Sequence, residues 1–452
     1  MKWRRLILPI LFCCWSICWL NAQLSISGVR FTEAEAPAGQ RMQVWLLSES
    51  SPAVDLKIKA NRGESLMRYE RSIQDAVPVV EANYDGSVWH VRNPKLGCGY
   101  YVQPASGLPT VYYWLIDYTS VPFPESPLEV VVDPEMPCER VLLKAKTPFR
   151  EFFCYTPQGD LVVVPRLYKV TYQTQEYNSD KFSYELQRQT QLVRPSRDGG
   201  ILSFLAPLDD TEFTLEGDRF SEVLGYSISL RSPRFFCQRV EVHGYYKLEG
   251  QSSASEGLAE GQLPRSLSAP AQVTLKAIGN GPVASLFQWT IVRGDVANTE
   301  NREIVFQFSG AESNYTFSEA GTYTIELVAT ARNGACSASA ERVTTTVQTS
   351  RLEVPNAFSP NASPGINDIF RVVHTSLVEF DARIYNEWGN ELYHWTDPNG
   401  GWDGTYGGKF VEGGVYYYVI SARGSDGKVY NERGHLNILQ SDLQAGVPGF
   451  SN

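Results

Sequence analysis

Residues 380–395 read Phe-Asp-Ala-Arg-Ile-Tyr-Asn-Glu-Trp-Gly-Asn-Glu-Leu-Tyr-His-Trp, and this stretch decides the fold of the carboxy-terminal part of the chain. Apolar and polar side chains alternate over residues 380–384, which is the period of two that buries one face of a β-strand. Glycine and asparagine within residues 388–390 tolerate a positive φ, so the chain turns there and runs back over residues 391–395. The pattern predicts a β-hairpin, in which we expect the Trp388 side chain to pack against a sandwich.

Further blocks flank this hairpin in the sequence. They are Val-Pro-Asn-Ala-Phe-Ser-Pro-Asn at 354–361, Gly-Ile-Asn-Asp-Ile-Phe at 365–370, Gly-Trp-Asp-Gly-Thr at 401–405 and Gly-Gly-Val-Tyr-Tyr-Tyr-Val-Ile at 413–420. Tyrosine and valine favour strands, whereas the glycine, asparagine and aspartate clusters favour turns. The blocks therefore predict a small β-sandwich, but by themselves they indicate no function.

The order and spacing of the blocks resemble the gliding-motility-associated C-terminal domain of Bacteroidota, which is the type B sorting domain of the type IX secretion system. The motif residues that carry the resemblance are Pro355, Asn356, Ala357, Phe358, Ser359, Pro360, Asn367, Asp368, Tyr385, Asn386, Trp388, Gly389, Trp402, Asp403, Gly404, Tyr416 and Tyr418. The family's Gly-Asp-Gly is replaced by Ala-Ser-Pro-Gly at 362–365, which argues against a cation at this loop. A tail over 440–452 also extends past the usual end of such domains.

The resemblance implies a route and a set of partners. A signal peptide would carry the chain to the periplasm, and the type IX secretion translocon would recognise the folded terminal domain. Type B domains are associated with a PorP/SprF-like outer-membrane barrel, which would be a partner here. The expected location is the cell surface, in association with the outer membrane.

Residues 1–22 have the pattern of a signal peptide. Lys2, Arg4 and Arg5 precede an apolar run over 6–20, and Ala22 offers a small residue for cleavage. Removal of these basic residues takes the net charge from −10 to −13, which argues against nucleic acid as a partner. No later apolar run reaches the length of a spanning helix, so we expect no direct membrane span.

The whole chain is predicted to be all-β, with four tandem Ig-like or β-sandwich domains after the signal peptide. The third domain resembles a polycystic-kidney-disease (PKD) repeat, because Phe-Gln-Trp at 287–289 precedes a cleanly alternating strand at 322–328. The predicted domains are an N-terminal β-sandwich at 23–135, a second β-sandwich at 136–247, a flexible linker at 248–267 that divides the chain into halves, a PKD-like domain at 268–349 and the sorting domain at 350–452.

Five cysteines remain after signal removal, and export makes them candidates for disulfides. Cys154 and Cys237 each follow a pair of phenylalanines, so we predict a bridge between them. A bridge between Cys98 and Cys138 is a weaker alternative, and we expect Cys336 to be free. The five lack the spacing of a zinc site.

Catalytic and metal-binding patterns are scarce. The chain has neither an HExxH motif nor a G-x-S-x-G elbow, so we expect no enzymatic activity and no cofactor. A hydrolase built from carboxylates on distant strands stays open as an alternative. The loop at 397–404 offers oxygen ligands suited to calcium, but its glycine and aspartate density favours a tight turn.

The preferred interpretation is a non-enzymatic cell-surface protein that the type IX secretion system exports through its terminal domain. The chain has few modules ahead of that domain, which suggests the sharper hypothesis of an accessory component of the secretion or gliding machinery. The alternative is a surface adhesin or glycan-binding protein that uses its two N-terminal domains. Whether the terminal domain is cleaved is left open.

Overall fold

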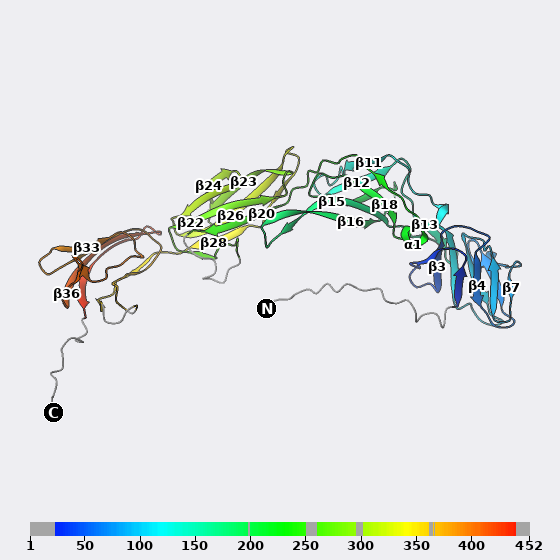
Figure 1. Cartoon of the computed structure of the whole chain (residues 1–452), viewed down its shortest axis with the longest axis horizontal. Helices are drawn as coiled ribbons and strands as arrows, with labels where there is room; N and C mark the ends of the chain where they lie inside the picture. Colours follow the sequence, from blue (N-terminus) through cyan, green and yellow to red (C-terminus); the bar gives the residue numbers. More distant parts are fainter. Residues whose placement is uncertain are drawn as a thin grey trace, which may run out of the picture. The chain divides into compact units, whose positions relative to one another are not determined.

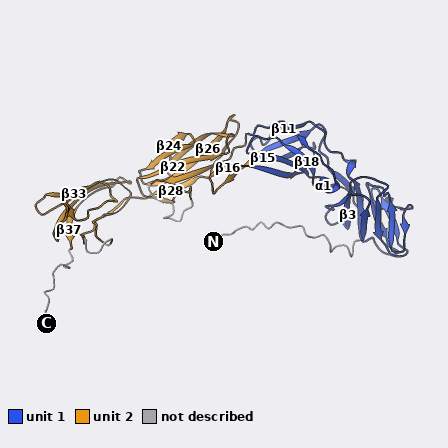
Figure 2. Cartoon of the chain, in the orientation of Figure 1, with its two compact units in different colours: residues 1–174, 186–237 blue, residues 175–185, 238–452 orange. Residues whose placement is uncertain are grey.

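The computed structural model describes residues 23–197, 199–249, 260–294, 302–360, 365 and 367–439, so the expected signal peptide lies outside the described residues. Almost all regular structure is β-strand, distributed over separate sheets (Figure 1), which confirms the all-β prediction of tandem sandwiches. The chain forms two compact units, Met1–Thr174 with Leu186–Cys237 and Gln175–Glu185 with Gln238–Asn452 (Figure 2). Among the described residues, no helix is long and apolar enough to cross a membrane.

The first module packs a sheet of order β1-β4-β8-β7 against one of order β2-β3-β10-β9-β5-β6. Its elements are β1 (Leu24–Ser27), β2 (Phe31–Ala34), β3 (Met42–Leu47), β4 (Asp55–Lys59), β5 (Ser65–Tyr69), η1 (Ile73–Asp75), β6 (Val77–Pro78), β7 (Asn83–Tyr84), β8 (Val88–Arg92), β9 (Cys98–Gln103), β10 (Tyr112–Asp117) and η2 (Tyr118–Ser120). The most uniformly apolar strand, β10, is central, because it pairs in parallel with β3 and antiparallel with β9. Burial on both faces explains its composition.

The second module continues unit 1 with the sheets β11-β12-β17, β13-β14 and β16-β15-β18-β19. Its elements are β11 (Leu128–Val132), β12 (Arg140–Ala145), β13 (Phe152–Tyr155), β14 (Leu161–Val164), β15 (Tyr168–Asn178), β16 (Ser183–Val193), β17 (Leu202–Leu205), β18 (Thr214–Asp218), α1 (Ser221–Leu224) and β19 (Leu230–Arg231). The end of the β15–β16 hairpin belongs to unit 2. There the Tyr177 ring stacks on the His243 ring, with 3.8 Å between the ring centres. Gly225, with a φ of 83°, ends α1, and the next strand, β19, begins at Leu230.

One apolar cluster joins the first two modules into a single body. Trp114 and Val44 of the first module lie in the same buried cluster as Phe152, Phe220 and Leu224 of the second. The clustered side chains exclude water from both modules at once, so each module covers apolar surface of the other.

A buried ion pair lies at this junction. The Arg166 Nε donates to the Asp218 carboxylate at 2.5 Å, and both side chains are inaccessible to solvent. The first module supplies further partners, because the Tyr118 hydroxyl donates to the same carboxylate at 2.8 Å and the Val121 carbonyl accepts from Arg166 at 2.7 Å. The guanidinium carbon also lies 4.3 Å from the ring centre of Phe123.

The third module contains the sheets β20-β22-β25 and β21-β28-β26-β23-β24, with β27 paired to β26. Its strands are β20 (Val242–Leu248), β21 (Ser266–Leu267), β22 (Ala271–Gly279), β23 (Ala284–Arg293), β24 (Glu303–Ser309), β25 (Glu312–Phe317), β26 (Gly321–Ala331), β27 (Ser337–Ser339) and β28 (Val343–Val347). Trp289 of β23 is fully buried at its centre. The alternation predicted at 322–328 is observed within β26.

The predicted linker and the predicted boundary at residue 247 need correction. Strand β20 pairs along its length with β22, so it belongs to the third module and not to the second. At the other end of the predicted linker, β21 pairs with β28, and Leu263 and Leu267 are buried. The apolar leucines anchor the end of a segment whose overall composition is polar, and only 250–259 lie outside the described residues. The division between the units falls at Cys237–Gln238 instead.

The fourth module is built on a five-stranded sheet of order β30-β37-β36-β32-β33, with the ribbons β29-β31 and β34-β35. Its strands are β29 (Arg351–Glu353), β30 (Ala357–Phe358), β31 (Val373–Thr375), β32 (Leu377–Tyr385), β33 (Glu391–Trp395), β34 (Thr405–Tyr406), β35 (Lys409–Phe410), β36 (Gly414–Gly424) and β37 (Val429–Ile438). The buried Ser376 connects it to the third module, since its hydroxyl accepts from the Ala269 amide and its amide donates to Ser268.

The cysteine pairing differs from the prediction. Cys154 carries a free, buried thiol, so the bridge predicted between Cys154 and Cys237 is absent. The Cys237 thiol donates to the Pro207 carbonyl at 2.7 Å. Cys138 and Cys336 are each disulfide-bonded, which corrects the expectation of a free Cys336. Aromatic neighbours in the sequence report burial of a cysteine but not the position of a partner, and burial alone makes no bridge.

The free thiols should be unreactive in the folded protein. Cys98 is also free, and burial raises the pKa of both Cys98 and Cys154 to about 11. The reactive thiolate is therefore scarce at pH 8, and we expect alkylation about a hundredfold slower than for an ordinary cysteine. Peptide mapping after iodoacetamide treatment, with and without urea, measures this. Rapid native labelling of either residue would contradict the burial.

Candidate functional site

The first motif block forms one edge of the fourth module. Strand β30 pairs in parallel with β37, and the exposed Asn356 accepts hydrogen bonds at its carbonyl from Asn437. The Phe358 side chain is 1% exposed and lies 5.7 Å from Trp402 and 6.0 Å from Phe370, measured between ring centres. This block therefore closes the sheet and fills its core.

The next motif residues close the loop after β30. The Ser359 amide donates to the carbonyl of Asn367, which has a φ of 55°. The Asp368 carboxylate accepts from the Gly365 amide at 2.9 Å, so it is engaged in the turn. Within the described part of the chain, no cluster of three or more histidine, cysteine, aspartate or glutamate side chains is arranged to hold a metal ion.

The Trp-Asp-Gly block supplies the centre of the core. Trp402 is fully buried, its backbone pairs with that of Phe370, and its indole N–H donates to the Thr405 carbonyl at 2.9 Å. The Asp403 carboxylate accepts from the Thr405 amide and hydroxyl, so it caps a turn. Gly404 has a φ of 80° and lies so close to Pro360 that a β-carbon would meet it at 2.9 Å. This contact explains why glycine follows the aspartate.

The two motif tyrosines line the inner face of β36. The Tyr416 ring makes an edge contact with Trp402 at 5.8 Å, and its hydroxyl donates to the Glu412 carbonyl at 2.9 Å. The Tyr418 ring lies 6.2 Å from Phe370. A β-carbon on Gly434 of β37 would approach the Tyr418 hydroxyl oxygen to 2.4 Å, so a larger residue there would displace the Tyr418 ring. The sequence did not point to Gly434, because the side chain that it accommodates belongs to the neighbouring strand.

The motif turn between β32 and β33 contradicts one expectation. Trp388 is 80% exposed, so it does not pack against the sandwich. The turn is nevertheless well ordered: the Asn386 side-chain oxygen accepts from the amides of Trp388 and Asn390 at 3.1 and 2.9 Å, and Gly389 has a φ of 82°. Tyr385, the residue before the turn, is half-buried. The hairpin ends beyond the edge of the core, so the indole has no inner face to cover.

The loop at 397–404, weighed above as a calcium candidate, uses its carboxylates locally. Asp397 accepts from the backbone amide of Asn399 at 2.9 Å, and Asp403 is the cap described above. Both contacts agree with the tight-turn interpretation.

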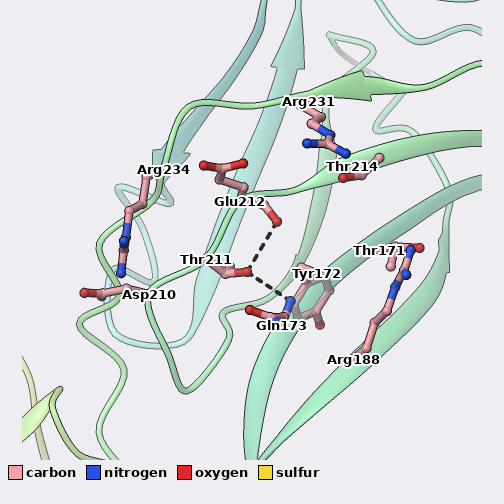
Figure 3. A pocket seen from close by; sticks show the side chains of 10 residues that line it. All are labelled: Thr171, Tyr172, Gln173, Arg188, Asp210, Thr211, Glu212, Thr214, Arg231 and Arg234. Carbon is pink, nitrogen blue, oxygen red and sulfur yellow. Dashed lines mark hydrogen bonds between the residues drawn. The ribbon is translucent and has the colours of Figure 1, made fainter.

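A polar cavity in the second module is a separate candidate. It has a volume of about 450 Å³ beside β15, β16, β18 and β19 (Figure 3). It is lined by Thr171, Tyr172, Gln173, Arg188, Asp210, Thr211, Glu212, Thr214, Arg231 and Arg234. These residues converge from distant positions in the sequence, so no local pattern predicted the cavity.

The charges in this cavity are mixed. Arg188 donates to Glu216 at 2.8 Å, and Figure 3 shows the guanidinium groups of Arg231 and Arg234 as well as the carboxylates of Asp210 and Glu212 among the lining side chains. Hydroxyl and guanidinium donors thus alternate with carboxylate acceptors, which suits a neutral, strongly hydrogen-bonding ligand better than a simple anion.

Two family models match parts of this chain. Residues 352–438 match the family model of the CHU_C type IX secretion signal domain, and residues 130–232 match that of a fibronectin type III domain, Fn3_FA. The chain matches none of the curated proteins. Among solved structures, dimeric latent PorU from Porphyromonas gingivalis is similar at 11% sequence identity and a TM-score of 0.16, over 73% of this chain and 35% of that one.

The matched ranges follow the strands. The fibronectin type III match runs from β11 to β19 and excludes β20, while the signal-domain match covers the whole fourth module from β29 to β37. Residues 352–438 are therefore a CHU_C type IX secretion signal domain, preceded by a fibronectin type III-like domain, in a chain addressed to the type IX secretion machinery and, through it, to the cell surface.

Proposed function

We propose that this chain is a non-enzymatic cell-surface protein whose folded fourth module is the export address, and that a PorP/SprF-like outer-membrane barrel retains it there. The observation that carries the proposal is that the matched residues build a complete domain with its own buried core around Trp402 and Phe358. An extended signal peptide would need no such core. The type IX secretion machinery would therefore recognise the surface of a folded domain.

The first stage of the route rests on the sequence. A signal peptide at 1–22 would deliver the chain to the periplasm, where the modules, including a PKD-like third module, fold before export. A role as an accessory component of the secretion or gliding machinery is the sharper form of this proposal. Co-purification of stoichiometric outer-membrane barrel from native membranes would favour that role over a role as cargo.

Deletion of residues 352–452 tests the address directly. The remaining modules keep their own sheets and lose a few hydrogen bonds at the junction, each of which contributes about 1 kcal/mol. We therefore expect a folded chain that accumulates in the periplasm. Fractionation and protease shaving of intact cells measure its location.

The reciprocal experiment grafts residues 351–452 onto a periplasmic reporter. In a host with type IX machinery, the reporter should reach the surface. If the deleted chain is displayed at normal levels, or the graft stays in the periplasm, the fourth module is not the address.

A second candidate is glycan binding by the N-terminal modules. The cavity beside β15 and β18 favours it, because its volume of about 450 Å³ and its alternating donors and acceptors fit a small saccharide. Retention on a glycan array that is lost in Arg231→Ala would support this function.

A further inference from the structure

The exposed Trp388 demands a physical reason. Its side chain is 80% exposed, whereas Trp395 and Trp402 in the same module are 7% and 0% exposed. Among the described residues, no other tryptophan is exposed. An indole left in water forgoes the burial of a large apolar surface, which docking on a partner would recover. Tryptophan is also among the residue types that dominate binding energy at interfaces.

The indole is presented by a fixed backbone. Asn386 and Asn390 close the base of the turn through a backbone hydrogen bond of 3.0 Å. Inside the turn, the Asn386 side-chain oxygen accepts hydrogen bonds from two backbone amides. Strand β32, which carries the turn, is paired on both sides by β33 and β36. Because the turn is ordered before binding, little conformational entropy remains to be lost on docking.

The surroundings of the turn define the partner's chemistry. Glu387 precedes the tryptophan and Glu391 begins β33, and both are exposed. Burial, followed by the nearby carboxylates of Glu412 and Glu387, raises the pKa of the Tyr416 hydroxyl, which places those two carboxylates at the same end of the sheet. Glu391 lies 3.9 Å from Arg383, so Glu387 and Glu412 supply the acidic rim beside the turn that carries the indole. A complementary surface is an apolar pocket with basic residues at its edge.

We propose that Trp388 is the anchor through which the signal domain docks, with the indole entering an apolar pocket rimmed by lysine or arginine on the recognising component of the type IX machinery. This inference rests on the proposed export function and adds the contact residue and the partner's chemistry. The surface continues from the turn along the outer face of β36, where Tyr417, 48% exposed, lies across from Tyr385.

The test uses the full chain in a host with type IX machinery. Trp388→Ala should leave the unfolding temperature unchanged, because an exposed side chain contributes little packing, yet lower the surface-displayed amount about tenfold or more. Trp388→Phe should restore part of it. Glu387→Lys, which reverses charge at the rim, should also lower display. Tyr406→Ala is the matched control, since Tyr406 is an aromatic residue 57% exposed on a different hairpin, and it should behave as wild type.

The outcomes separate this inference from the function on which it rests. If Trp388→Ala is displayed normally while deletion of residues 352–452 abolishes display, the docking inference is wrong and the address stands. If the Trp388→Ala variant and the chain that lacks residues 352–452 are both displayed at normal levels, the proposed function fails as well. If light scattering shows that Trp388→Ala abolishes self-association while export is retained, the turn joins copies of this chain and the inference is overturned.

Discussion

Replacement of Trp402 by alanine should unfold the fourth module and abolish export. Trp402 is fully buried, contacts Phe358 and Tyr416, and satisfies its indole N–H with the Thr405 carbonyl. Truncation of a buried tryptophan costs about 3–5 kcal/mol through lost burial and the cavity left behind. That approaches the whole stability of a small domain, so the machinery would meet an unfolded address.

Two readouts check this prediction. Differential scanning calorimetry should show the loss of one transition, and fractionation should show the chain in the periplasm. Trp388→Ala is the matched control for folding, because it removes the same side chain from an 80% exposed position and should leave every transition in place. A stable, exported Trp402→Ala variant would mean that the domain can repack without its central tryptophan.

Asp218→Asn should destabilise the first two modules together. The Asp218 carboxylate receives the Arg166 Nε at 2.5 Å and the Tyr118 hydroxyl at 2.8 Å, and the amides of Phe220 and Ser221 bind its other oxygen. Asparagine keeps the shape but leaves the buried guanidinium without a counter-charge. Breaking a fully buried pair in this way costs about 3–5 kcal/mol.

Urea denaturation of unit 1 measures the change in the free energy of unfolding. Because the pair joins both modules, we expect a single transition that moves as a whole. The control is Glu125→Gln, which breaks an exposed ion pair between Glu125 and Lys146 at 2.9 Å and should cost less than about 1 kcal/mol. A similarly small effect for Asp218→Asn, or a shift in one of two separate transitions, would contradict the coupling.

The local patterns predicted the strands well. The alternation over 380–384 and the return strand over 391–395 correspond to β32 and β33, and the alternation over 322–328 lies within β26. These predictions succeed because a strand's face is set by neighbours two residues apart, which the sequence displays directly. Turn residues were equally informative, since Gly404 and Gly389 both adopt the positive φ that favours glycine.

Predictions that depended on distant partners were wrong. The expected bridge from Cys154 to Cys237 is absent, and a strand assigned to the second module, β20, pairs with β22 of the third. Composition marked the segment at 248–267 as a linker, yet Leu263 and Leu267 at its end are buried in a sandwich. In each case the local pattern was compatible with several partners, and only packing selects one.

The sequence by itself determined the all-β class, the position of most strands and, through the ordered motif blocks, the type IX signal domain at the carboxy-terminal end. Only the tertiary structure decided which motif residues build that domain and which face water. Trp402 and Trp388 each stand within two residues of a glycine in a motif block, but one is fully buried and the other is 80% exposed. The physical reason is that a side chain is buried only if its segment lies over the core and does not extend past the edge of the sheet. Strand lengths and strand pairing across the whole module decide this.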